Sequence, residues 1–191
     1  MLRRTILTLI LTTGLCGTVG AQYGRYGVRG KAAPAWEVEK WINLPEGQGS
    51  LNVSDFKGKV LYLYCFQSWC PGCHSHGFPT LRKLVRHYRD DADVAFVAVQ
   101  TTFEGFAANT AKKAWGCARK YNLSIPVGHT GTNGVRSALM RAYRTGGTPW
   151  TIVIGTEGKV QYNDFRIHVD VAVKLIDRLK GQAKAAAAVE D

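Results

Sequence analysis

The sequence predicts an α/β protein with a central mixed β-sheet that is flanked by helices on both faces. Two uninterrupted apolar runs, 60–66 (VLYLYCF) and 93–100 (DVAFVAVQ), are typical of strands buried on both sides. Two later runs, 148–155 (TPWTIVIG) and 159–165 (KVQYNDF), are joined by the hairpin turn signal TEG. Strand, helix, strand, helix and then a hairpin is the order of a mixed sheet.

The remaining elements follow from local patterns. The stretch 49–59 (GSLNVSDFKGK) predicts a short strand and a turn, with Ser54 or Asp55 opening a helical turn. Amphipathic helices are expected over four segments: 78–90, 109–121, 134–144 and 169–180. The first of these carries an apolar stripe from Phe78 to Tyr88 at helical spacing.

Length and composition indicate one globular domain, since the chain has 191 residues of which 46% are hydrophobic and 20% charged. The glycine-rich and basic stretch 22–35 is expected to be a flexible linker. The domain is expected over 36–181, and residues 182–191 are expected to form a C-terminal tail or the frayed end of a helix. The formal charge of +11 is spread over predicted helices and the N-terminal segment without an aromatic-basic motif. No nucleic-acid partner is therefore expected.

The N-terminus predicts export. Arg3 and Arg4 precede an apolar run that extends to about Cys16, and small residues lead up to Ala21. The run is too short to remain as a membrane-spanning helix, and Leu15 does not favour lipidation of Cys16. Residues 1–21 are interpreted as a signal peptide cleaved near Ala21, which would leave a soluble protein in a bacterial periplasm.

The segment 68–76 (SWCPGCHSH) has three possible interpretations. Cys70 and Cys73 can form a redox dithiol, and together with His74 they can form a haem-attachment site. With His76 as well, four side chains could bind zinc. Haem is disfavoured because the only methionine after the signal peptide lies among arginines in a predicted helix, and zinc because its four ligands would lie unusually close together. No cofactor or metal is therefore expected.

The position of the cysteines favours the dithiol. The pair follows a buried strand and precedes a helix, so Cys70 lies where free N–H groups favour the thiolate. Cys73 lies one turn further on, where it can resolve a mixed disulfide. Trp69 is expected to shield the pair, and Pro71 suits an early helical position that needs no N–H donor.

Two segments resemble one family. The stretch 54–73 (SDFKGKVLYLYCFQSWCPGC) and the stretch 146–160 (GGTPWTIVIGTEGKV) are similar to the thioredoxin-like TlpA/ResA group of exported thiol-disulfide oxidoreductases, which is related to the AhpC/TSA-redoxin superfamily. The resemblance extends over about 34–180 and implies a thioredoxin-like fold. It also implies a cis peptide bond before Pro149, with Thr148 beside the cysteines.

The resemblance further implies how the site works. Trp69, Pro71, Gly72 and Thr148 are expected to contact the substrate. The substrates would be protein disulfides, which the protein would reduce, and a membrane thiol donor would then restore the dithiol. The direction of electron flow rests on the resemblance alone.

The chain departs from this group in several places. Tyr64 replaces the buried acid of thioredoxins, and Glu104 is the candidate for the group's proton-relaying glutamate, with an exposed loop glutamate as the alternative. An extra residue in 74–79 (HSHGFP) is expected to rearrange the first helical turn. His74 is expected to be solvated.

Other activities remain as alternatives. A peroxiredoxin-like thiol peroxidase would need a threonine and a proline where the chain has Gln67 and Leu63. Cys65 and Cys117 are expected to be buried thiols, with a second disulfide between them as the alternative.

Overall fold

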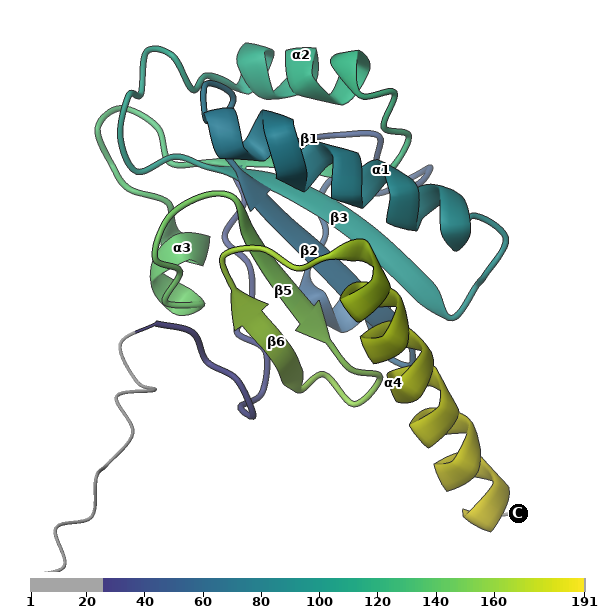
Figure 1. Ribbon diagram of the computed structural model, residues 1–191. Helices are drawn as coiled ribbons and strands as arrows, with labels where there is room; N and C mark the ends of the chain where they lie inside the picture. The colour runs from purple at the N-terminus through teal and green to yellow at the C-terminus, as the bar shows by residue number, and fades with distance from the viewer. Residues whose placement is uncertain (1–25, 191) are drawn as a thin grey trace, which may run out of the picture.

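Strand β2 (Val60–Phe66) lies inside a six-stranded sheet in the computed structural model of the protein, which describes residues 26–190 (Figure 1). The strand order is β1-β4-β3-β2-β5-β6. The other strands are β1 (Lys40–Ile42), β3 (Val94–Thr101), β4 (Val127–Thr130), β5 (Trp150–Ile154) and β6 (Val160–Asp164). β2, β3 and β4 run parallel and the other pairings are antiparallel, which confirms the predicted mixed sheet.

Helices cover both faces of the sheet. They are η1 (Val53–Phe56), the π-helix η2 (Cys73–Gly77), α1 (Phe78–His87), α2 (Ala111–Lys120), α3 (Ala138–Ala142) and α4 (Val169–Glu190). The cluster of buried side chains on one face joins β2 to α1, α2 and α4. The cluster on the other face joins β2 to α3 and to the segment that leads into β2.

Alternation along β2 explains these two cores. Tyr62, Tyr64 and Phe66 enter the first cluster, whereas Leu63 and Cys65 enter the second. Every residue of β2 is buried, as expected from its uninterrupted apolar run. No helix within the described residues is long and apolar enough to cross a membrane.

The prediction that 22–35 is a flexible linker is wrong for residues 26–35, the part of it that the structure describes. From Gly27 onward the segment lies along the outer edge of β6, where the Gly30 N–H donates to the Val160 carbonyl at 2.8 Å and the Val160 N–H donates to Lys31 at 2.9 Å. Val28 is buried against the second core cluster. An edge strand has unpaired backbone groups, and this segment satisfies several of them. Residues 22–25 and the predicted signal peptide, 1–21, lie outside the described residues.

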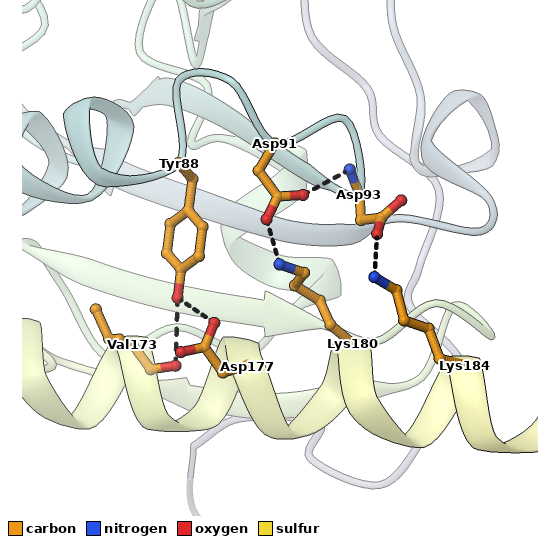
Figure 2. A network of polar contacts seen from close by, with 7 residues as sticks. All are labelled: Tyr88, Asp91, Asp93, Val173, Asp177, Lys180 and Lys184. Atoms are coloured by element: carbon orange, nitrogen blue, oxygen red, sulfur yellow. Dashed lines mark hydrogen bonds and ion pairs between the residues drawn. The ribbon is translucent and has the colours of Figure 1, made fainter.

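Of the two expectations for 182–191, the helix end fits the structure and the tail does not, because α4 continues to Glu190. The alanine-rich sequence has high helix propensity. Two lysines of this helix, Lys180 and Lys184, form ion pairs with Asp91 and Asp93 in the loop before β3 (Figure 2). These contacts extend the helix beyond the apolar stripe that predicted it.

Two short strands were not predicted. β1 (KWI) and β4 (VGHT) lack an apolar run of strand length, and they pair with each other at the edge of the sheet. Gly128 allows this close pairing, because a Cβ atom there would lie 2.7 Å from Val38 Cγ1. The stretch 49–59 contains η1, with Asn52 as its N-cap.

Candidate active site

Cys70 occupies the N-cap of the helix that follows β2. The Cys70 carbonyl accepts hydrogen bonds from the N–H groups of Cys73 at 3.1 Å and His74 at 3.3 Å. The Cys70 sulfur also accepts the Cys73 N–H at 3.2 Å, as the side-chain oxygen of an N-cap residue usually does. The helix N-terminus therefore directs its free donors at this sulfur, as the sequence predicted.

The two cysteines have unequal acidity. A hydrogen bond from the Cys73 thiol, aided by the backbone N–H groups of Cys73 and Gly72, lowers the pKa of the Cys70 thiol to about 6 although burial opposes this. Burial and the neighbouring Cys70 raise the pKa of Cys73 well above its usual range. At neutral pH the pair therefore carries one thiolate, on Cys70, and one thiol, on Cys73.

The Thr148-Pro149 loop faces the cysteine pair. The peptide bond between Thr148 and Pro149 is cis. The Thr148 carbonyl lies 3.5 Å from Cys70 Sγ and accepts a hydrogen bond from the thiol form. Gly72 packs against the proline ring, since a Cβ atom there would lie 3.1 Å from Pro149 Cδ. The structure thus brings Cys70 and Gly72 into contact with Thr148 and Pro149, which belong to a distant segment of the sequence.

The outer rim of the site is partly apolar. The Trp69 side chain is 48% exposed and lies over the loop after β3, where a Cβ atom on Gly105 would lie 3.4 Å from its Nε1. Pro71 is exposed at the first turn of the helix. The two residues that flank Cys70 in the chain therefore both expose apolar surface.

The first turn of the helix is rearranged, as the extra residue in 74–79 led us to expect. Residues Cys73–Gly77 form a π-helix, in which the Phe78 N–H donates to the Cys73 carbonyl five residues earlier. The Tyr64 hydroxyl donates to the same carbonyl at 3.4 Å. Gly77 makes room for this ring, because a Cβ atom at position 77 would overlap the hydroxyl and lie 2.5 Å from Tyr64 Cζ.

His74 is half-buried, which corrects the expectation of a solvated side chain. Its Nε2 lies 2.7 Å from the Ser68 carbonyl and its Nδ1 lies 2.7 Å from the Tyr121 hydroxyl. Its ring also stacks on Tyr121. His74 therefore ties the start of the helix to the residues just before Cys70.

A buried polar network holds the other side of this turn, and the sequence did not reveal it. The Ser68 N–H lies 2.9 Å from Asn109 Oδ1 and 3.1 Å from Gln100 Oε1. Asn109 Nδ2 donates to Gln67 Oε1 at 3.3 Å. Gln100 and Asn109 come from the end of β3 and the loop after it, so the backbone before Cys70 is fixed by side chains from a different strand. In the sequence, Gln100 and Asn109 are marked only as polar residues at the end of an apolar run or after it.

Glu104 is exposed in the loop after β3, and its contact with this network is made by its backbone carbonyl, which accepts from Asn109 Nδ2 at 3.1 Å. The structure thus favours the alternative interpretation, an exposed loop glutamate. The position of the acid in thioredoxins is filled by Tyr64, whose burial raises its pKa well above the usual range. Tyr64 therefore remains protonated and acts as a donor.

The other two cysteines lie on opposite faces of the sheet. Cys65 packs in one core cluster and Cys117 in the cluster on the opposite face of the sheet, so the alternative disulfide between them is excluded. Burial raises the pKa of both thiols. Both are buried thiols, as the sequence predicted, and a raised pKa leaves little thiolate at neutral pH.

The haem and zinc interpretations do not fit the geometry. Both ring nitrogens of His74 have protein partners, and His76 Nδ1 lies 2.7 Å from the Ser75 hydroxyl. Within residues 26–190, no group of three or more histidine, cysteine or acidic side chains is arranged to hold a metal ion.

A mixed sheet, a cysteine pair at the helix after β2 and a facing proline loop define the class of thioredoxin-like thiol-disulfide oxidoreductases. The profile of the Redoxin family matches residues 29–169, and the chain belongs to that family. Both findings confirm the class that the sequence predicted.

Solved structures support the same class. A thioredoxin-like superfamily protein is 29% identical with a TM-score of 0.71, and the match covers 78% of this chain and 96% of that one. A thiol-disulfide isomerase from Corynebacterium glutamicum is 27% identical with a TM-score of 0.67, covering 77% and 96%. A candidate thiol:disulfide interchange protein DsbE from Chlorobium tepidum shares the fold at 21% identity and a TM-score of 0.53, covering 82% and 97%. No curated protein sequence matches this chain.

Proposed function

We propose that the protein reduces disulfides of partner proteins through Cys70 and Cys73. The observation that carries this proposal is the unequal pair: Cys70 is at the N-cap with a pKa lowered to about 6, and the fully buried Cys73 has a raised pKa. An attacking thiol must ionise and be reachable, whereas a resolving thiol must wait until its neighbour has reacted.

The reaction balances as one two-electron exchange. The Cys70 thiolate attacks one sulfur of the substrate disulfide, so that a Cys70–substrate disulfide forms and the substrate S–S bond breaks. The leaving thiolate takes up a proton. Cys73 then loses its proton and attacks Cys70 Sγ, so that the Cys70–Cys73 disulfide forms, the Cys70–substrate disulfide breaks, and the second substrate thiolate leaves and takes up the proton that Cys73 lost. The substrate ends as a dithiol, and Cys70 and Cys73 end as a disulfide.

Substrate docking is assigned to the rim that surrounds Cys70. Trp69 and Pro71 offer exposed apolar surface, and the absence of a side chain at Gly72 allows the Pro149 ring to pack closely against the helix start. The backbone of Thr148 would pair with an extended substrate segment, by resemblance to the group. An extended segment laid here would place its cysteine over Cys70.

The protein is further proposed to be exported by a signal peptide at 1–21 and to act in a bacterial periplasm. Its disulfide form would be reduced again by a membrane thiol donor. The reductant direction rests on the resemblance to the TlpA/ResA group.

The test compares two serine variants of the exported protein. Cys73→Ser removes the resolving thiol and should accumulate mixed disulfides with partner proteins, seen as higher-mass bands that a reductant abolishes. Cys70→Ser should give almost none, because the attacking sulfur is gone. Cys117→Ser is the matched control and should behave like the wild type. Equal adducts in both active-site variants would overturn the assignment, and a redox titration of the pair would decide its direction.

A further inference from the structure

Cys73 is enclosed by the protein, and its sulfur must nevertheless become a thiolate once Cys70 has formed a mixed disulfide. The Cys73 side chain has no exposed area, and burial is the main cause that raises the pKa of its thiol. A buried thiolate is costly unless hydrogen-bond donors are directed at it. The resolving step therefore depends on which donors surround the Cys73 sulfur.

Tyr64 places a donor beside this sulfur. Its side chain is fully buried and belongs to the same core cluster as Cys73. The hydroxyl lies 3.4 Å from the Cys73 carbonyl oxygen, and it also interacts with the Cys73 thiol, as does the backbone N–H of Gln67. These two donors lower the pKa of the Cys73 thiol against the larger effects of burial and of Cys70. Of the two, the Tyr64 hydroxyl is the one that a substitution can remove.

Packing fixes the position of the Tyr64 ring. The ring stacks on Phe66 and meets Phe78 edge to face, with centroids 5.8 Å and 5.2 Å apart. Gly77 leaves the space that the hydroxyl occupies, because a Cβ atom there would overlap the hydroxyl oxygen. The hydroxyl hydrogen can still rotate about the C–O bond. It can therefore turn from the carbonyl to the sulfur without movement of the ring.

The hydroxyl can leave the Cys73 carbonyl at little cost. That carbonyl also accepts the Phe78 N–H, which closes the π-helix. Burial raises the pKa of Tyr64 well above the usual range, so the phenol keeps its proton throughout the reaction. Tyr64 is thus a donor available to an acceptor that forms beside it, and it cannot serve as a base.

We propose that the Tyr64 hydroxyl donates a hydrogen bond to the Cys73 thiolate while this thiolate attacks Cys70 Sγ. The Cys73–Cys70 bond forms as the Cys70–substrate bond breaks, and the proton that Cys73 lost ends on the second substrate thiolate. Tyr64 retains its own proton. This role rests on the proposed function and adds to it a residue that acts on the second step and not on the first.

The test is a single turnover of the reduced protein with equimolar dithiobis(nitrobenzoate), a disulfide whose released thiolate is coloured. The first equivalent marks attack by Cys70 and the second marks resolution by Cys73. Tyr64→Phe keeps the ring and should leave the first phase unchanged. It should slow the second phase about tenfold or more, as expected for loss of a hydrogen bond to a charged group. The rise of the second phase with pH should also move to higher pH, because the thiolate has lost a donor.

Tyr62→Phe is the matched control. Tyr62 is equally buried two residues earlier, on the same face of β2, and its hydroxyl lies 3.3 Å from Thr151 Oγ1. This variant should leave both phases unchanged. A second phase of Tyr64→Phe with the rate and pH dependence of the wild type, equal slowing of both phases, or equal slowing by the two tyrosine variants would each overturn the proposal.

A ring-fluorinated tyrosine at position 64 provides a second variant. Its more acidic hydroxyl is a stronger donor, so the pH dependence of the second phase should move to lower pH, opposite to Tyr64→Phe. A shift in the same direction as Tyr64→Phe would assign the effect to packing and overturn the proposal. Release of only one equivalent by the wild type would overturn the proposed function and this inference with it. A wild type that releases two equivalents beside an unaffected Tyr64→Phe would overturn this inference alone.

Discussion

The helical stretch from Pro71 to His87, which consists of its first turn, η2 and α1, uses polar side chains in different ways at its two ends. At the first end, where β2 leads into the helix, hydrogen bonds converge on Cys70 and on the backbone just before it. At the second end, Tyr88 and Asp91 contact α4 instead, through Asp177 and Lys180 (Figure 2). The first arrangement changes the acidity of a thiol. The second joins a loop to the last helix.

This difference indicates that the reactivity of Cys70 and the stability of the fold depend on separate parts of the molecule. Donors at the first end stabilise a charge that would otherwise be costly to bury. At the second end, Asp91 is paired with Lys180 and Asp93 with Lys184, and the Asp177 carboxylate accepts from the Tyr88 hydroxyl, so these groups join two elements and do not activate a thiol. Substitutions at one end should therefore leave the property of the other end unchanged.

The largest expected effect is in thiol alkylation. With a pKa lowered to about 6, Cys70 should react with iodoacetamide with a midpoint near that pH, because only the thiolate attacks. Cys65 lies five residues earlier in β2, has no exposed area and should react more than about 100-fold more slowly at pH 7. Mass spectrometry of each cysteine peptide measures both rates.

Denaturant provides the control for this experiment, since all thiols should then react alike. A Cys70 midpoint near 8.5, the ordinary value for a free cysteine, would show that the N-cap donors do not act on its sulfur.

A second prediction concerns the packing of the π-helix on β2. Gly77→Ala places a methyl group against the Tyr64 ring and should destabilise the fold by about 1–3 kcal/mol, the usual cost of overpacking. Urea unfolding measures this free energy. Because the change lies next to the site, it should also alter the Cys70 alkylation rate.

Gly116→Ala in α2 is the matched control, because no atom lies within 4 Å of the added Cβ. Its expected effect is a gain of about 0.5–1 kcal/mol from helix propensity. A similar gain from Gly77→Ala would contradict the tight contact with Tyr64.

A third prediction tests the second end of α1. Lys180→Met removes the partner of Asp91, whose side chain is 26% exposed, and should cost about 1 kcal/mol of unfolding free energy. Lys184→Met removes the more exposed pair with Asp93, 3.4 Å apart, and should cost close to nothing. Neither variant should change the alkylation rate of Cys70. A changed rate would contradict the conclusion that the two ends act separately.

The smallest effect is the pH dependence of that pair. The hydrogen bond with Lys180 is the main cause that lowers the pKa of Asp91, so the folded carboxyl has a lower pKa than the unfolded one. Its stabilisation is present above the unfolded pKa of about 3.9 and is lost as pH falls through the folded pKa. The difference between wild type and Lys180→Met should therefore disappear on acidification. A difference that persists at low pH would assign the effect to packing of the lysine stem.

Long local patterns were predictable from the sequence, and contacts between distant segments were not. The runs that form β2 and β3 are apolar throughout because both of their faces are covered. β1 and β4 are short, and their positions depend on each other rather than on a local pattern. The path of 26–35 likewise depends on the free edge of β6, which no local pattern reveals.

The residues of the candidate site likewise fall into those that a local pattern predicted and those that it did not. Cys70, Cys73 and Pro149 were found because the first two share a motif with a helix start and the third lies in a similar block. Gln100 and Asn109 reach Ser68 across 32 and 41 positions, a contact that only the packed sheet creates. Glu104 was assigned by analogy of position, and the loop that holds it turns its side chain to solvent.

The segment that lies on β6 has a consequence for association between molecules. A free sheet edge is a template on which a second chain can add a strand, which is a common route to aggregation. Here the Val160 carbonyl accepts from Gly30, the Val160 N–H donates to Lys31, and the Gly158 carbonyl accepts from Ala33. At the opposite margin, β1 is three residues long and offers little length for such an addition. The chain thus limits strand addition at both margins of its sheet.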